Sequence, residues 1–138
     1  MKKIVFLVIL FSKISLGYIN IYPTEFDKDI TNGATQIFKL YNRTDEERRY
    51  RIYIENVGKN SMSQWIEIYP QSISLKPLEE DEIRIAITPP SSISKGEYRA
   101  KLVIKEVEVP RKKKEKKVKL MTLFKLNMKG YVGEKDVI

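Results

Sequence analysis

The sequence predicts an all-β protein: a two-sheet sandwich of seven to eight strands with a long final hairpin. Three observations predict this class. Apolar and polar residues alternate along most of the chain, which is the period of a half-buried strand. Turn-forming residues separate the alternating segments at short intervals. No window has the apolar spacing of an amphipathic helix. Short strands spaced by turns are typical of a sandwich.

The expected strands follow from alternation and from the turns between them. Tyr50, Ile52 and Ile54 alternate with polar neighbours, and Ile83 and Ile85 flank an arginine. Turn residues such as Asn32-Gly33, Lys76-Pro77, Pro89-Pro90 and Lys95-Gly96 close individual segments. In order, we expect strands over Ile19–Tyr22, Gln36–Asn42, Arg49–Asn56, Trp65–Tyr69, Ser72–Leu75, Glu82–Thr88, Glu97–Val109 and Lys117–Tyr131. Trp65 is expected to pack in the core or between the sheets.

The last two expected strands are unusually long. Lys117–Tyr131 has 15 residues, which is roughly 50 Å of strand, whereas a usual strand has about five or six residues. Together with Glu97–Val109 it predicts an extended hairpin. The outer edge of this hairpin is a place where another chain can pair, including a second copy of the same protein.

The first residues predict export. Two lysines precede eight apolar residues, Ile4–Phe11, and Ser15 and Gly17 suit a cleavage site before Tyr18. Eight residues are far fewer than the roughly 20 that cross a bilayer. We therefore expect a signal peptide over 1–17, cleaved near Gly17, one domain over 18–133, a tail over 134–138, and no stable membrane insertion.

Composition excludes most enzyme chemistry. The 138 residues include no Cys and no His, so a disulfide framework, a Cys/His metal or haem site, a cysteine nucleophile and a histidine base are ruled out. The acids Glu79–Glu82 lie together in an expected turn, where they are typically solvated, and no Gly-rich phosphate loop is present. We expect no enzyme activity, no cofactor and no metal.

Much of the net charge of +8 comes from one basic loop. Between the last two strands lie six basic residues and one acid: Arg111, Lys112, Lys113, Lys114, Glu115, Lys116 and Lys117. Such a run could contact nucleic acid or another anionic surface. However, no aromatic residue is interleaved with it, and basic runs are mostly solvated loops. We expect no nucleic-acid partner.

Several segments, in their order and spacing, resemble the amino-terminal domain of PapD-like periplasmic pilus-assembly chaperones. These segments are FKLYN (Phe38–Asn42), RYRIYIEN (Arg49–Asn56), SISLKP (Ser72–Pro77), EIRIAIT (Glu82–Thr88) and GEYRAKLVIKEVEVP (Gly96–Pro110). The resemblance implies an immunoglobulin-like sandwich in the periplasm. It also implies donor-strand complementation, in which the last strand completes a fimbrial or envelope subunit that lacks a strand.

The resemblance also implies site residues. The subunit that such a chaperone binds is called its client. Aligning KLNMKG (Lys125–Gly130) on the family's last strand places Val118 and Leu120 on positions that enter the client, followed by Thr122 and Phe124 on the same face. The alternative is that Val118 and Leu120 pack inside their own domain. Lys125 matches a lysine that holds the client's terminal carboxylate, and Lys28 is the nearest candidate for its basic partner. Either lysine could instead be a solvated surface charge.

One departure leaves a second function open. Family members have a second sandwich domain, whereas this sequence ends near the end of the first. The alternative is an exported immunoglobulin-like structural or adhesive module without chaperone activity, because fold is inferred more safely than function.

Overall fold

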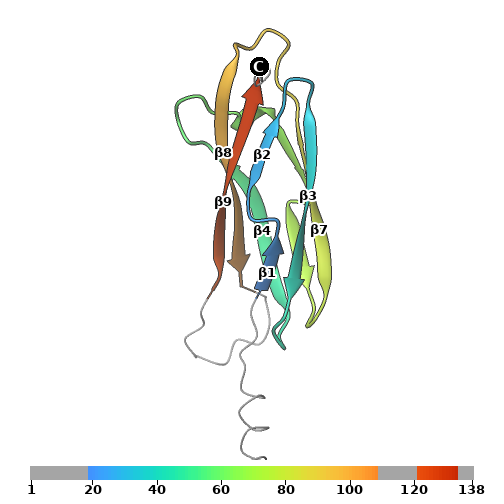
Figure 1. Cartoon of the computed structure of the whole chain (residues 1–138). Helices are drawn as coiled ribbons and strands as arrows, with labels where there is room; N and C mark the ends of the chain where they lie inside the picture. Colours follow the sequence, from blue (N-terminus) through green and yellow to red (C-terminus); the bar gives the residue numbers. More distant parts are fainter. Residues whose placement is uncertain (1–18, 109–120, 134–138) are drawn as a thin grey trace, which may run out of the picture.

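The protein is a sandwich of two β-sheets, described by a computed structural model over residues 19–108 and 121–133 (Figure 1). The four-stranded sheet has the order β1 (Ile19–Tyr22), β3 (Ala34–Asn42), β7 (Glu80–Ile87) and β5 (Ile66–Tyr69). The five-stranded sheet has the order β2 (Phe26–Asp29), β9 (Leu123–Val132), β8 (Gly96–Val107), β4 (Arg48–Glu55) and β6 (Ser72–Leu75). The predicted all-β immunoglobulin-like sandwich is confirmed.

The amino-terminal part of the described chain contributes to both sheets. β1 pairs antiparallel with β3, and after Pro23 the chain joins the other sheet, where β2 pairs in parallel with β9. The remaining pairs are antiparallel, including the hairpin of β8 and β9, which runs from Gly96 opposite Val132 to Lys105 opposite Leu123.

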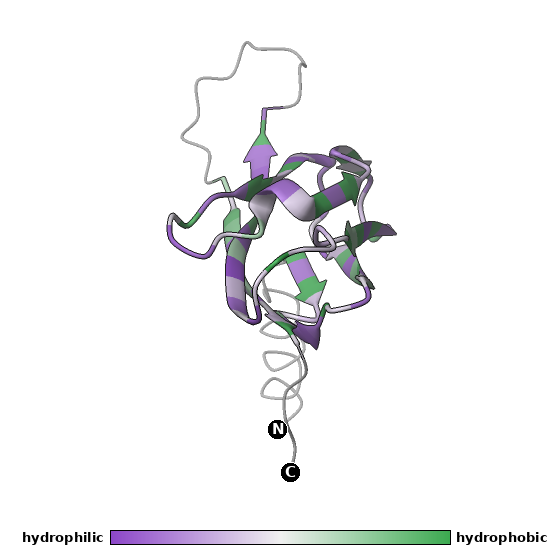
Figure 2. Ribbon diagram, turned by 90° about the horizontal axis from the view of Figure 1, so that it is seen from above, coloured by the Kyte–Doolittle hydropathy of each residue, from purple (hydrophilic) through white to green (hydrophobic). Residues whose placement is uncertain are grey.

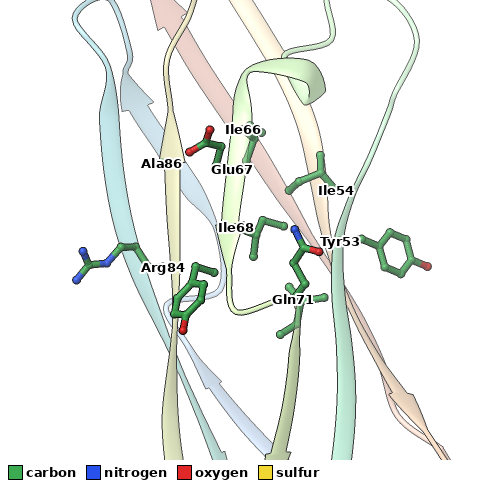
Figure 3. Close-up of a pocket in the computed structure, with 10 residues that line it drawn as sticks. Tyr53, Ile54, Ile66, Glu67, Ile68, Gln71, Arg84 and Ala86 are labelled. Atoms are coloured by element: carbon green, nitrogen blue, oxygen red, sulfur yellow. The ribbon is translucent and has the colours of Figure 1, made fainter.

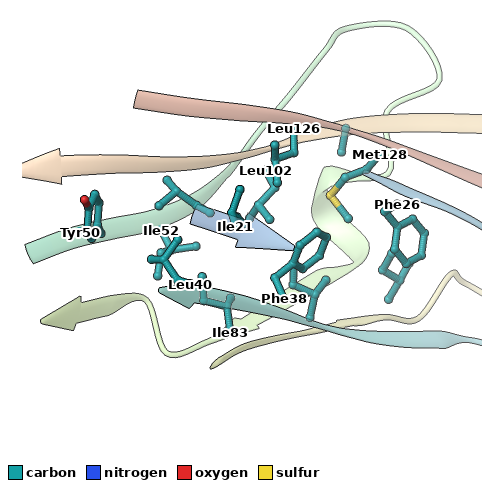
Figure 4. Close-up of a cluster of buried hydrophobic side chains, with 14 of the residues drawn as sticks. Ile21, Phe26, Phe38, Leu40, Tyr50, Ile52, Ile83, Leu102, Leu126 and Met128 are labelled. Carbon is teal, nitrogen blue, oxygen red and sulfur yellow. The ribbon is translucent and has the colours of Figure 1, made fainter. Parts of the chain in front are cut away.

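Alternation along the strands builds the core between the two sheets. In Figure 2 the strands carry alternating hydrophilic and hydrophobic bands, and the hydrophobic residues turn inward because successive side chains of a strand point to opposite faces. Figure 4 shows the result, with side chains of both sheets meeting in one cluster. Its fully buried members include Phe26, Phe38, Leu40, Tyr50, Ile52, Ile83, Leu102 and Met128.

The structure corrects the expected elements in two places. The described residues form nine strands, and the additional one is β2, whose sequence FDKD contains a single apolar residue and therefore lacks a strand pattern. Trp65 belongs to a short 3-10 helix, Ser63–Trp65, before β5. Its predicted packing role is confirmed, because it packs against the core with its ring centroid 4.9 Å from that of Tyr98.

Several predictions concern residues outside the described part. These are the signal peptide, the tail, the basic loop from Arg111 to Lys117, and Val118 and Leu120. The described part of β9 spans Leu123–Val132, so the predicted start of this strand at Lys117 also lies outside it. Within the ranges 19–108 and 121–133, no helix has the length and apolar character needed to cross a bilayer.

Candidate functional site

The two halves of β9 have different surroundings. Along Met128–Tyr131, β8 lies on one side of the strand and β2 on the other. β2 is fixed further by the Ile30 amide, which donates to the Tyr131 carbonyl at 2.9 Å. Along Leu123–Asn127, only β8 pairs with β9 among the described strands. Figure 1 shows β2 beside the half of β9 that leads to the C-terminus. We call Leu123–Asn127 the open edge.

Backbone geometry identifies which groups of the open edge are available. The Glu106 amide of β8 donates to the Thr122 carbonyl at 2.9 Å. In an antiparallel ladder, alternate residues direct their backbone groups to the same neighbour. Phe124 and Leu126 therefore bond toward β8, and Leu123 and Lys125 direct their amide and carbonyl groups outward. The sequence analysis did not name Leu123, and it named Lys125 only for its ammonium group, because a period of two assigns side chains to faces and says nothing about edges.

Side chains on β9 follow the predicted faces over the described positions. Leu126 and Met128 are buried, and Phe124 is half-buried against the core. On the opposite face, Leu123 is 54% exposed and Lys125 is exposed. Thr122 and Phe124 thus have side chains directed toward the protein's own sandwich.

A buried polar cluster holds the beginning of β9. The Glu106 carboxylate, in a residue only 5% exposed, accepts a hydrogen bond from the Thr122 amide at 2.8 Å and one from Arg48 at 2.9 Å. Burial alone would lower the pKa of Arg48, but the hydrogen bond and charge of Glu106 raise it above its ordinary value. The cluster ties β9 to β4 and β8. Sequence reasoning missed it, because its members are far apart in the chain.

The two lysines predicted to hold a carboxylate have separate partners. Lys125 Nζ lies 3.3 Å from Glu55 Oε1, and Lys28 Nζ donates to the Thr35 carbonyl at 3.2 Å. Lys28 pairs with Gly130, five residues beyond Lys125, which is about 16 Å along the strand. The structure therefore does not bring these two ammonium groups together.

A groove opens at the opposite side of the sandwich, between β4 and β5 (Figure 3). Its volume is about 670 Å³, and Ile54, Ile66 and Ile68 supply its apolar lining. Arg84 and Tyr53 point away from it to either side. No nucleophile is paired with a base there. Among the described residues, no cluster of three or more His, Cys, Asp or Glu side chains could bind a metal ion.

Comparison with known proteins gives matches to solved structures only. No family model matches the sequence, and no curated protein matches it. The periplasmic chaperone SfaE superposes with a TM-score of 0.67 at 13% identity, over 85% of this chain and 59% of that chain. The SafB chaperone, solved in complex with the Salmonella enterica SafA pilin, gives 0.65 at 15% identity, over 86% and 56%.

The chain has the PapD-like fold. It matches the amino-terminal domain of these chaperones and spans between 56% and 59% of the chaperone chains that it resembles. The fold is also similar to that of SSP-19, an MSP-domain protein like family member of Caenorhabditis elegans, with a TM-score of 0.60 at 17% identity over 82% of this chain and 99% of that chain. None of these three structures is named as an enzyme.

Proposed function

We propose that the protein is a periplasmic chaperone-like protein that binds fimbrial or envelope subunits by donor-strand complementation through β9. The open edge supports this proposal. One half of β9 is held between β2 and β8, while Leu123–Asn127 leaves one side without a described strand partner. Such an edge can accept a strand from another chain, whose backbone groups would bond to Leu123 and Lys125.

In this proposal each group of side chains has its own role. Val118 and Leu120 enter the client's apolar groove. Thr122 and Phe124 lie on the same face of the strand and pack toward the protein's own core. Lys125 exchanges Glu55 for the client's terminal carboxylate, since Lys125 lies on the open edge and a charge-assisted bond there favours a fixed register. Lys28 supplies positive charge further along β9, and the basic loop from Arg111 to Lys117 attracts acidic client segments.

The proposal includes export. Residues 1–17 would act as a signal peptide that is removed near Gly17. Amino-terminal sequencing of the protein recovered from the periplasm should therefore begin at Tyr18. A protein that stays in the cytoplasm with Met1 attached would contradict this part of the proposal.

A second candidate function rests on the comparison with SSP-19. The chain covers 99% of that single-domain structure, so a domain of this size and fold exists without a second sandwich. On this alternative, the protein is an exported structural or adhesive binding module without chaperone activity. It predicts that no unfolded subunit is protected, and that the open edge is capped, for example by the same edge of a second copy.

Replacing the side chains that are proposed to enter the client, Val118 and Leu120, with a charged residue distinguishes the two candidate functions. We expect Val118→Glu and Leu120→Glu to fold normally and to lose co-purification with an exported subunit, because a carboxylate cannot enter an apolar groove. Met121→Glu is the matched control, since alternation places Met121 on the opposite face and its side chain is 43% exposed. Loss of folding in the first two variants would assign both side chains to the protein's own core. Unchanged capture would contradict donation.

A further inference from the structure

The outer face of the five-stranded sheet concentrates positive charge. Between Arg49 and Glu55, the strands β4, β8 and β9 present their outward side chains in aligned rows. One row contains Arg51, Lys105 and Leu123, and the next contains Tyr53, Val103 and Lys125. The cations that point outward from these rows are together called the basic face: Arg49, Arg51, Lys101, Lys105 and Lys125. Glu55 is the acid among them.

The charges of this face are poorly compensated. Lys125 pairs with Glu55 at 3.3 Å, and Arg49 donates to the Ser74 hydroxyl. Within the described residues, no acid lies in ion-pair distance of Arg51, Lys101 or Lys105. Arg51 and Lys105 are directly opposite in the ladder, an arrangement of like charges that destabilises a sheet. A multivalent anion on this face would relieve that repulsion.

Apolar side chains lie among the cations. Leu123 is 54% exposed and Tyr53 is 41% exposed, and both lie in the rows that contain Arg51 and Lys125. Cations next to exposed aromatic and aliphatic side chains are typical of surfaces that contact the headgroup region of a bilayer. The neighbouring hollow, of about 900 Å³, is lined by Lys59 and Lys129 and by Arg99, which pairs with Glu97 at 2.8 Å.

We propose that the basic face binds the surface of an anionic phospholipid bilayer. Neighbouring rows place the cations about 5 to 7 Å apart over three adjacent strands, which suits an extended layer of phosphate groups. The contact is peripheral: cations meet phosphates, while Tyr53 and Leu123 enter the headgroup layer. This binding does not require the donor-strand function, because it uses side chains on the face of the sheet, whereas donor-strand pairing uses the backbone groups of the open edge.

Vesicle co-sedimentation of the full chain tests the proposal. We expect binding to vesicles of phosphatidylcholine with about 30% phosphatidylglycerol at low salt, and weaker binding as salt rises. Neutral phosphatidylcholine vesicles measure any contribution of the apolar segment Ile4–Phe11. The double variant Arg51→Gln/Lys105→Gln should bind the anionic vesicles about 30-fold more weakly, from about a fivefold effect for each cation near the surface.

The matched control removes two cations from the other sheet. Lys39→Gln/Arg84→Gln makes the same change in net charge on exposed positions of β3 and β7, and its binding should be unchanged. Arg51→Gln/Lys105→Gln should also keep or raise the thermal midpoint, because it removes a like-charge pair. Equal weakening in both double variants, or loss only when the lysines of the basic loop are replaced, would overturn the proposal. Binding to polyglutamate but not to vesicles would assign the face to an acidic polypeptide and equally overturn it.

Discussion

Glu106, which the sequence analysis did not single out, joins the strands that build the candidate site. It is 5% exposed, and its two carboxylate oxygens join β4 to the residue that precedes β9, through Arg48 and the Thr122 amide. A buried charge of this kind is tolerated only when it is paired. The position at which β9 starts is therefore fixed by a side chain on the neighbouring strand.

Glu106→Ala should lower the free energy of unfolding by about 1.5–3 kcal/mol, because it removes the charged acceptor of the half-buried Arg48 and of the Thr122 amide. Glu106→Gln retains an acceptor for the Thr122 amide, so its loss should be smaller. Urea unfolding followed by Trp65 fluorescence measures both. Equal stability of Glu106→Ala and the unmodified protein would show that water compensates the pair.

The buried phenol of Tyr50 makes the stability of the protein depend on pH. Burial raises the pKa of Tyr50 above its ordinary value of 10.0, and the charge of Glu106 raises it further. The unfolded chain then loses the phenolic proton first, so the neutral phenol contributes fully to stability below about pH 10. This contribution is lost as the pH rises toward the folded-state pKa. Tyr50→Phe should flatten the fall in urea midpoint above pH 10, and Tyr69→Phe, at a side chain 77% exposed, should not.

Asn42 shows how far single residues could be predicted. The sequence places it at the end of an expected strand, and the structure confirms that β3 ends there. The hydrogen bonds of its fully buried amide were not predictable, because two acceptors, the carbonyls of Leu75 and Lys76, lie 33 and 34 residues away. Alternation describes neighbours in sequence and carries no information on such distant pairs.

At the scale of elements, β2 and β9 depend on each other. β2 is recognisable as a strand only once β9 is in place, since its four residues include one buried apolar side chain, Phe26. Gly130 permits the close approach of the layers at this end. A Cβ there would lie 2.7 Å from Ile30 Cδ1 and 3.0 Å from Met62 Sδ.

Gly130→Ala should therefore destabilise the protein by about 1–3 kcal/mol, the usual cost of overpacking a core. The control is Gly58→Ala. In contrast to Gly130, a Cβ at Gly58 would meet no atom within 4 Å, but Gly58 has a positive φ of 96°, so any loss there reports backbone strain only. Denaturant midpoints compare the two. A stable Gly130→Ala variant in which β2 keeps its exchange protection would contradict this packing account.

The open edge of β9 predicts a pattern of amide hydrogen exchange. In the isolated protein, the amides of Leu123 and Lys125 should exchange hydrogen faster than those of Phe124 and Leu126, because only the latter pair bonds toward β8. Amide exchange followed by NMR measures all four. Uniform protection across these residues would mean that the edge is already closed, either by the chain itself or by a second copy.

At the scale of the whole molecule, alternation was sufficient to predict the sandwich, and the order of its segments indicated the PapD-like arrangement. What alternation could not predict was the division of β9 into a held half and an open half. That division arises from where β2 docks, and thus from packing between segments about 100 residues apart. Lys28 and Lys125, which were predicted to hold one carboxylate together, show the same limit, since their separation depends on the register of β2 against β9.

The most direct test places a photo-crosslinking residue at position 123 of the protein in the cells that produce it. Leu123 lies on the open edge of β9 with its side chain 54% exposed. Position 39, exposed on the other sheet, serves as the control. The account predicts an adduct between position 123 and one exported subunit, identified by mass spectrometry, and none from position 39. Adducts only to the protein's own chain or to a second copy, or none at all, would contradict the assignment of β9 to a client.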